Sequence, residues 1–215
     1  MKVLTGALFS LSVGFGCLAG LIRWKHLDQA FYPFVILLFV GLLNETASLI
    51  LMYKGYSNVV NYNVFVLAEG LLICTQFFKW RLIDQRFLKV VFLSFIFTWL
   101  VEALARDKDV FYSYSIIYYS LAIVVLSIGM INGIVFKEPN GFHTDSRFLI
   151  CSSFIVYFIF SALTEAFWLL GLFYSKEFRL GMQELLTYIN LLSNVIYVFA
   201  IIWIPAKLRF IRRLS

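Results

Sequence analysis

The stretch 31-FYPFVILLFVGLLNETASLILM-52 decides how this chain folds. Its 22 residues contain no Lys, Arg, His or Asp, and Glu45 is its one charged residue. An α-helix needs about 20 consecutive apolar residues to cross the hydrocarbon core of a bilayer, so the stretch is long enough to span a membrane. A carboxyl group is costly in such a place, which makes Glu45 and its neighbour Asn44 candidates for function.

The remaining sequence repeats this pattern. Hydrophobic residues make up 62% of the 215 residues and charged residues 14%, whereas a soluble domain carries about 25% charged residues. The apolar runs do not alternate as β-barrel strands do, and a backbone in lipid satisfies its own hydrogen bonds, so these runs are predicted to be helices. Seven transmembrane helices are expected, over residues 3–22, 31–52, 59–78, 88–105, 112–136, 148–173 and 184–206. Because their connections are short, the predicted fold class is all-α, with a single transmembrane domain over residues 1–215.

Lys and Arg predict the orientation of the helices. With the N-terminus outside, twelve of the eighteen Lys and Arg residues fall in the inner segments and six in the outer ones. Such a bias indicates a cytoplasmic C-terminus. The net charge of +6 then favours anionic lipid headgroups over nucleic acid as the partner of the basic tail. Residues 3–22 also resemble a signal peptide, but cleavage would leave Arg23 and Lys25 outside, against this bias.

A group of polar side chains is expected in the outer half of the bilayer. We predict a ligand-binding site there, formed by Glu45, Glu69, Asn44, Asn63, Asn190, Asn194 and Glu165. Within the helices no Lys, Arg or His lies at the depth of Glu45 and Glu69. Three arrangements remain open: protonated carboxyl groups bonded to amides, carboxylates facing a water-filled cavity, or carboxylates holding a cation. All three turn the two side chains toward the interior of the bundle.

Several of these residues also have a purely structural interpretation. Asn190 and Asn194 can serve as hydrogen-bonding links between helices, and Glu165 can reach the basic residues that follow its helix. Glu102 precedes Arg106 by four residues, which predicts a surface ion pair. The tyrosines of 111-FYSYSIIYYS-120 are typical of an aromatic belt at the membrane boundary, although some of their hydroxyl groups can line the polar cavity.

Several classes of chemistry find no support in the sequence. His26 and His143 are the only histidines, and both fall in predicted inner loops, which excludes bis-His haem ligation and a Ser–His triad at the polar cluster. No Cys/His metal spacing, P-loop or Gly-rich nucleotide motif occurs. We therefore expect no enzyme, no catalytic residue, no metal site and no cofactor.

Two stretches, 42-LLNETASLIL-51 and 61-NYNVFVLAEGLL-72, resemble those of small, uncharacterised seven-helix proteins of the Bacteroidota. This resemblance implies a multi-pass protein of the bacterial inner membrane, for which a membrane signalling partner is conceivable, and it brings no assigned activity. Short matches between the first stretch and 162-ALTEAFWLL-170 suggest an internal repeat. In that respect the architecture is similar to the three-plus-one-plus-three helices of SWEET-type sugar carriers, whose Pro-Gln motif is missing here.

The polar pattern leaves more than one function class open. The first is a binding or sensory module for a small ligand, and the second is a small carrier for a cation, a proton or a polar metabolite. A third is a non-catalytic scaffold for a partner protein. A carrier needs polar groups on a path to both sides. The inner halves 31-FYPFVILLFV-40 and 196-IYVFAIIWI-204 are nearly apolar, with Thr75, Gln76 and Asn132 as a thin inner path, which favours the first class.

Overall fold

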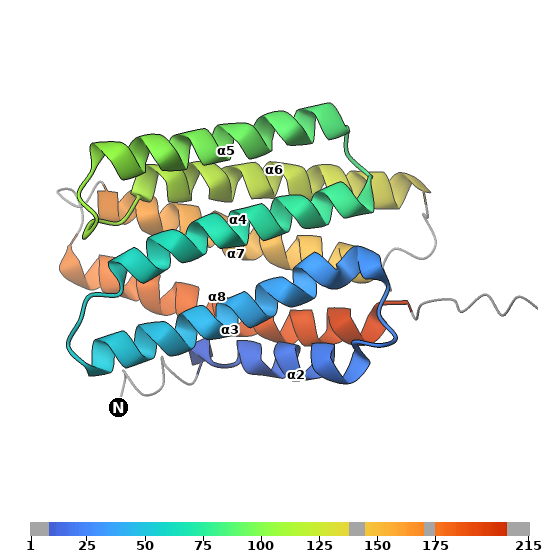
Figure 1. Ribbon diagram of the computed structural model, residues 1–215, viewed down its shortest axis with the longest axis horizontal. Helices are drawn as coiled ribbons and strands as arrows, with labels where there is room; N and C mark the ends of the chain where they lie inside the picture. The colour runs from blue at the N-terminus through green and yellow to red at the C-terminus, as the bar shows by residue number, and fades with distance from the viewer. Residues whose placement is uncertain (1–8, 138–144, 170–174, 206–215) are drawn as a thin grey trace, which may run out of the picture.

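The computed structural model describes residues 9–137, 145–169 and 175–205, which are helical and contain no β-strand. The elements are α2 (Val13–Arg23), the 3-10 helix η1 (Gln29–Phe31), α3 (Tyr32–Tyr53), α4 (Val59–Trp80), α5 (Gln85–Ala105), α6 (Ser113–Lys137), α7 (Ser146–Leu169) and α8 (Lys176–Trp203). Successive α-helices alternate in direction along one common axis (Figure 1). The predicted all-α fold class is confirmed.

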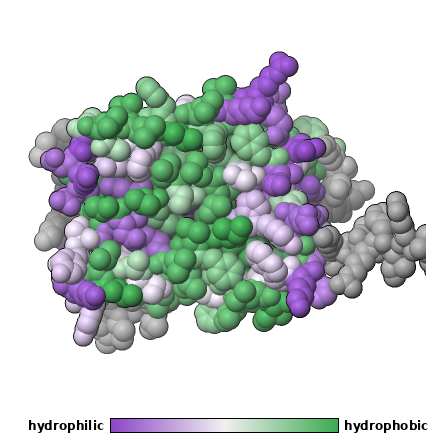
Figure 2. Space-filling model, viewed as in Figure 1, coloured by the Kyte–Doolittle hydropathy of each residue, from purple (hydrophilic) through white to green (hydrophobic). Residues whose placement is uncertain are grey.

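The bundle has two polar ends. We call the end with residues 54–58 and 106–112 the Gly55 end, and the end with residues 24–28 and 81–84 the Arg23 end. Figure 2 shows apolar side chains across the middle of one face and polar side chains toward both ends. Six helices, α3 to α8, are long and apolar enough to cross a membrane. Their length and this surface fit a multi-pass membrane protein.

The first predicted span is interrupted. Phe9 and Ser10 are helical, a turn follows, and α2 begins only at Val13. The Ser12 hydroxyl donates to the Phe9 carbonyl at 2.5 Å, and a serine that bonds to nearby backbone in this way competes with helix formation. The 11 residues of α2 extend about 16 Å, roughly half the thickness of the hydrocarbon core. Because residues 1–8 lie outside the described residues, the count of seven spans stays a prediction.

The other predicted spans agree with the structure to within a few residues at most of their ends. The largest difference is α8, which begins at Lys176 rather than at residue 184. The Ser175 side chain accepts a hydrogen bond from the Phe178 backbone N–H at 3.2 Å, and Glu177 lies in the first turn. Both features stabilise a helix start, so α8 continues beyond its apolar run. The end of the predicted span 148–173 lies outside the described residues.

Aromatic side chains fill the bundle toward the Arg23 end. We call this set, Phe34, Phe77, Phe154, Phe158 and Tyr197, the aromatic cluster. Its members come from four helices and are buried. The ring centroids of Phe34 and Tyr197 are 5.3 Å apart and those of Phe77 and Phe154 are 6.3 Å apart, in edge-to-face contacts. Such contacts are favourable for aromatic pairs, and the cluster is the largest aromatic part of this half of the interior, where Gln76, Ser146 and Ser153 are also buried.

Two polar side chains connect helix ends at the Arg23 end. The Arg23 guanidinium donates to the carbonyl groups of Ile201 at 2.7 Å and Ile204 at 2.9 Å, and also to that of Ile202. These carbonyls lie at the end of α8, where backbone acceptors run short of intrahelical donors, and that of Ile201 also accepts from the Ile204 N–H at 3.3 Å. Arg23 therefore joins α2 to the end of α8. The Gln76 amide similarly accepts from the Phe34 N–H at 2.8 Å and donates to the Ala30 carbonyl. Gln76 thus supports the η1–α3 junction, where the sequence suggested a polar path.

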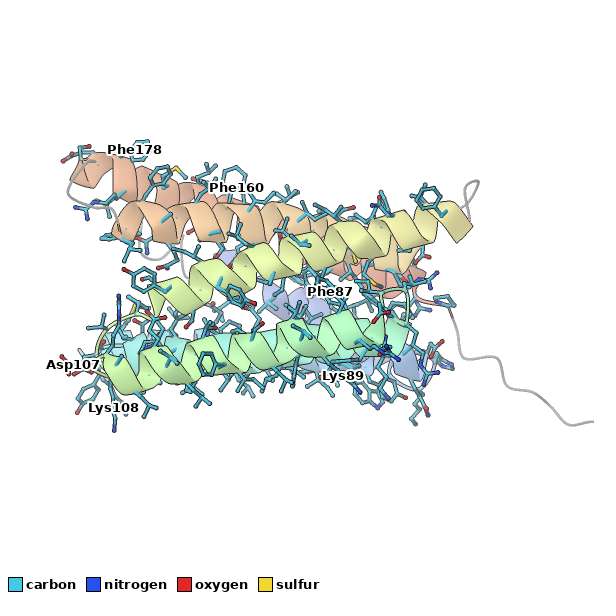
Figure 3. The ribbon with its side chains drawn as sticks, turned by 90° about the horizontal axis from the view of Figure 1, so that it is seen from above. Phe87, Lys89, Asp107, Lys108, Phe160 and Phe178 are labelled. Atoms are coloured by element: carbon cyan, nitrogen blue, oxygen red, sulfur yellow. The ribbon has the colours of Figure 1, made fainter. Side chains whose placement is uncertain are left out.

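Helix α5 lies at an edge of the bundle in both side views. In Figure 3 it runs along one side, while α7 and α8, which carry Phe160 and Phe178, form the opposite side. Only three of its residues are buried, namely Leu88, Phe95 and Glu102. They are spaced seven apart, which places them on one stripe of the helix.

Candidate functional site

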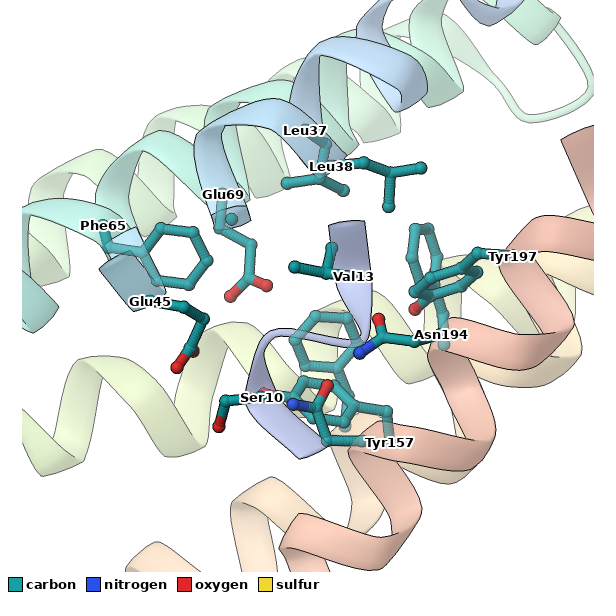
Figure 4. A pocket seen from close by; sticks show the side chains of 14 residues that line it. Ser10, Val13, Leu37, Leu38, Glu45, Phe65, Glu69, Tyr157, Asn194 and Tyr197 are labelled. Carbon is teal, nitrogen blue, oxygen red and sulfur yellow. The ribbon is translucent and has the colours of Figure 1, made fainter. Parts of the chain in front are cut away.

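A cavity of about 70 Å³ lies in the interior, between α3, α4, α7, α8 and the interrupted first segment (Figure 4). Its polar wall consists of Ser10, Glu45, Glu69, Tyr157, Asn190, Asn194 and Tyr197. Its remaining wall is apolar and includes Phe154 and Phe158 of the aromatic cluster. None of the described residues that line it is Lys, Arg or His. We call it the acidic cavity.

The two carboxyl groups reach the acidic cavity from neighbouring helices. Glu45 lies on α3 and Glu69 on α4, and Figure 4 shows both side chains directed into the same space. The Ser10 side chain lies within hydrogen-bonding reach of Glu45. The Tyr119 hydroxyl, from α6, donates a hydrogen bond to Glu69 Oε2. Two acidic groups therefore share one small space, supported by neutral hydrogen-bonding partners.

Asn194 connects the cavity to the interruption in the first segment. Its side-chain amide donates to the Ser12 hydroxyl at 2.9 Å, and this bond is buried. Ser10 and Val13, on either side of the turn, both line the cavity. Asn190, Asn194 and Tyr197 are spaced by four and three residues and share one face of α8. The turn and this face of α8 together form the wall opposite the two carboxyl groups.

Four of the seven predicted site residues meet at the acidic cavity, namely Glu45, Glu69, Asn190 and Asn194. The other three, which are Asn44, Asn63 and Glu165, do not line it. The side-chain oxygen of Asn44 accepts a hydrogen bond from Asn61 Nδ2 at 2.8 Å, and this bond joins α3 to α4. Glu165, on α7, lies within hydrogen-bonding reach of Ser113 at the start of α6.

Asn63 holds the connection between α5 and α6. Its side-chain amide donates to the Val110 carbonyl at 2.9 Å, and its oxygen accepts from the Tyr112 N–H at 3.2 Å. Its backbone carbonyl also accepts from the Trp99 indole at 3.0 Å. The Asn63 side chain thus supplies hydrogen-bond partners to backbone groups of the α5–α6 connection, which buried backbone groups require.

Sequence reasoning missed two tyrosines that line the cavity and left a third undecided. Tyr197 follows Asn190 by seven residues, a spacing that places it on the same helix face, so its position had a signal. Tyr157 lies in the apolar run 154-FIVYFIF-160, where no polar neighbour indicates which face is inward. Tyr119 belongs to the run assigned either to an aromatic belt or to the cavity. Of that run, Tyr112 and Tyr119 are buried while Tyr114 and Tyr118 are exposed.

Glu102 differs from its predicted role as one half of a surface ion pair. The pair with Arg106 is present, with 3.4 Å between Nε and Oε1, but Glu102 is only 6% exposed. Its carboxylate accepts from the backbone N–H of Ser115 at 2.8 Å and of Tyr114 at 3.3 Å. Backbone N–H groups at a helix start lack partners and attract negative charge. Glu102 therefore caps α6 from a neighbouring helix, and the prediction of a surface position was wrong.

A second cavity, of about 400 Å³, lies at the Arg23 end. Its charged lining residues are Asp28, Lys79, Asp145 and Arg147. Two of them form an ion pair with each other, since the Arg147 guanidinium donates to both oxygens of Asp145. Asp28 accepts from the Ala30 N–H and caps η1. Because three of these four charged residues, Asp28, Asp145 and Arg147, already have structural partners, the acidic cavity is the stronger candidate site.

Among the described residues no group of three or more His, Cys, Asp and Glu side chains is placed to hold a metal ion. The three cysteines, Cys17, Cys74 and Cys151, are free and buried. No protein-family model, no curated protein and no solved structure matches the chain. The geometry of the acidic cavity is therefore the feature that indicates a function.

Proposed function

We propose that this protein is an inner-membrane binding or sensory module whose acidic cavity takes up a small cation, either a proton or an alkali-metal ion such as Na⁺. One observation carries the proposal: Glu45 and Glu69 share a small interior space, and none of its described lining residues is a cation. Two ionised carboxylates in such a place repel each other and have lost much of their hydration. A bound cation relieves both costs.

The size of the cavity supports a cation over a larger solute. The cavity volume is about 70 Å³, whereas pockets for drug-sized ligands measure about 300–1,000 Å³. The small volume therefore favours a small ion over a sugar or another polar metabolite.

The surroundings of the cavity favour binding over transport. On its Arg23 side it meets the rings of Phe154 and Phe158. The polar groups beyond them already have partners, since Tyr197 lies within hydrogen-bonding reach of Ser153 and the Gln76 amide has partners on both its atoms. A carrier would need polar groups that continue toward that end. The one observation in favour of a carrier is the interruption at Ser12 beside the cavity, because carriers often hold ions at discontinuous helices. A carrier of cations is therefore the second candidate.

The sidedness of the cavity gives a prediction that labelling can check. From the bias of Lys and Arg we expect the Gly55 end to face outward. Tyr53→Cys, at a position 93% exposed, should react with a membrane-impermeant maleimide added to intact cells, whereas Lys25→Cys should react only after the membrane is opened. The native cysteines are buried, which keeps the background low. The opposite labelling pattern would reverse the proposed orientation.

Two titrations of the purified full-length protein test the proposal. Calorimetry with Na⁺ at a fixed alkaline pH measures metal binding, and a pH titration without Na⁺, followed by tyrosine fluorescence, measures proton binding. We expect a saturable response in at least one of the two titrations. If Na⁺ and protons bind to the same carboxylates, each ion should lower the apparent affinity for the other. A saturable response in neither rejects the proposal. Cation flux into proteoliposomes would establish the carrier instead.

A further inference from the structure

Helix α5 is the element with the fewest anchors in the bundle. It buries Leu88, Phe95 and Glu102, whereas α7 buries nine residues. Leu88 lies near the Arg23 end and Glu102 near the Gly55 end, where it caps α6. Between these two attachments, Phe95 is the one fully buried side chain of α5. The other contacts of its middle part are made by less buried side chains, namely the Trp99 indole to the Asn63 carbonyl and the Phe92 ring to Phe78. Helices held by few buried contacts are the ones that move at low energetic cost.

Phe95 packs directly beside the acidic residue on α4. A Cβ atom built on Gly70 would lie 2.4 Å from Cε1 and 2.7 Å from Cζ of Phe95, so the ring edge occupies the space that any side chain at position 70 would need. Gly70 follows Glu69 in the chain. The position of α5 relative to α4 is therefore set at the residue next to a cavity carboxyl group.

Tyr119 completes a chain of contacts from the cavity to α5. Its hydroxyl donates to Glu69, and its ring centroid lies 5.4 Å from that of Phe95 and 5.3 Å from that of Phe158. Tyr119 is only 3% exposed, and close-packed interiors transmit the displacement of one ring to the next. Glu69, Tyr119 and Phe95 thus form one connected path across three helices.

We infer that cation binding at Glu69 shifts α5 relative to α4 through Tyr119 and Phe95, so that α5 reports the occupancy of the cavity. This inference rests on the proposed function. A cation or a proton on Glu69 reduces its capacity to accept the Tyr119 hydrogen bond, which is strongest to a free carboxylate. When Tyr119 moves, Phe95 has no free space beside Gly70 to enter, because its ring edge already occupies the position of a Cβ atom there. The weakly anchored α5 moves instead.

A fluorine label on α5 tests this coupling. Phe97→Cys, at a position 67% exposed, carries a trifluoromethyl tag, and its ¹⁹F resonance is recorded in the full-length protein with increasing Na⁺ and, separately, with falling pH. Switching helices typically move by about 1–2 Å, and we expect the resonance to shift along the binding curve measured by calorimetry on the same sample. Phe95→Leu keeps the Glu69–Tyr119 hydrogen bond and removes the ring contact between Tyr119 and α5, so this variant should bind the cation and lose the shift.

Two further variants keep the test decisive. Ser94→Ala removes a different α5–α6 hydrogen bond, the 2.6 Å contact to the Tyr118 hydroxyl, and should retain the shift. Tyr119→Phe alters a hydrogen-bonding partner of Glu69, so its cation affinity is measured first, and at a saturating cation concentration it should also lose the shift. Binding without any ¹⁹F shift in the otherwise unchanged protein overturns the inference, and so does a shift that persists at saturation in Phe95→Leu. Absence of binding in that protein rejects the proposed function itself.

Discussion

Glu69→Gln is expected to abolish the cation response and to leave the protein folded. Glutamine keeps the shape of the side chain, and its amide oxygen still accepts the Tyr119 hydrogen bond. It carries no charge and releases no proton, so the cation loses one of its two acidic partners. Loss of one partner of a buried charge pair costs about 2–5 kcal/mol, which weakens the apparent affinity by about 30-fold or more.

The measurement is the same pair of titrations applied to Glu69→Gln. Glu165→Gln is the matched control, because Glu165 also lies in an apolar helix but does not line the cavity. The control should titrate as the unchanged protein does, and both variants should unfold at nearly the same temperature as that protein. Equal titration curves for Glu69→Gln and the unchanged protein would assign Glu69 a structural role and remove most of the case for a binding site.

Glu102→Ala should have the largest effect on stability. The change leaves the backbone N–H groups of Tyr114 and Ser115 without their acceptor and Arg106 without its ion partner. A lost hydrogen bond to a charged group costs about 1.5–3 kcal/mol, and loss of a helix cap alone costs about 1 kcal/mol. We expect the free energy of unfolding in detergent to fall by about 3 kcal/mol.

Glu102→Gln provides the graded comparison for this prediction. Its amide oxygen can still accept from one backbone N–H, so the loss of stability should be roughly half as large. Glu165→Ala, which removes a half-buried carboxyl group without a capping role, should change the unfolding free energy far less. Glu102→Ala unfolding at the same denaturant concentration as the unchanged protein would show that α6 does not depend on this cap.

The spans were predictable because the thickness of the bilayer sets their length. Six apolar runs became α3 to α8, with starts such as Val59 for α4 at the expected residue. The early start of α8 was missed because the first turns of this helix are polar and precede the apolar run, and because the Ser175 cap stabilises them. The turn before Val13 was missed because 10-SLSVG-14 is apolar enough for a span, and only the bonds of Ser12 show why the helix stops.

The sequence predicted how far along each helix the site residues lie, but not which way their side chains point around the helix axis. Position along a helix follows from the sequence, so Glu45 and Glu69 were correctly placed in one region of the interior. The rotation of a helix about its axis is poorly determined when apolar residues cover every face. Asn63 illustrates this point, since it lies six residues from Glu69 and is therefore about 120° away around α4. That angle turns Asn63 toward the α5–α6 connection and Glu69 toward the cavity.

The bond from Arg23 to the last turn of α8 joins an early segment of the chain to one of the last to be synthesised. A ribosome makes Arg23 long before Ile201 and Ile204, which supply the carbonyl groups that it binds. Until then, water or lipid phosphate satisfies the guanidinium, and α2 lacks the neighbour that holds it in place. The wall formed by Ser10 and Val13 is therefore complete only after α8 has been made. A chain interrupted earlier in translation carries both acidic residues without the Asn190 and Asn194 side of the cavity.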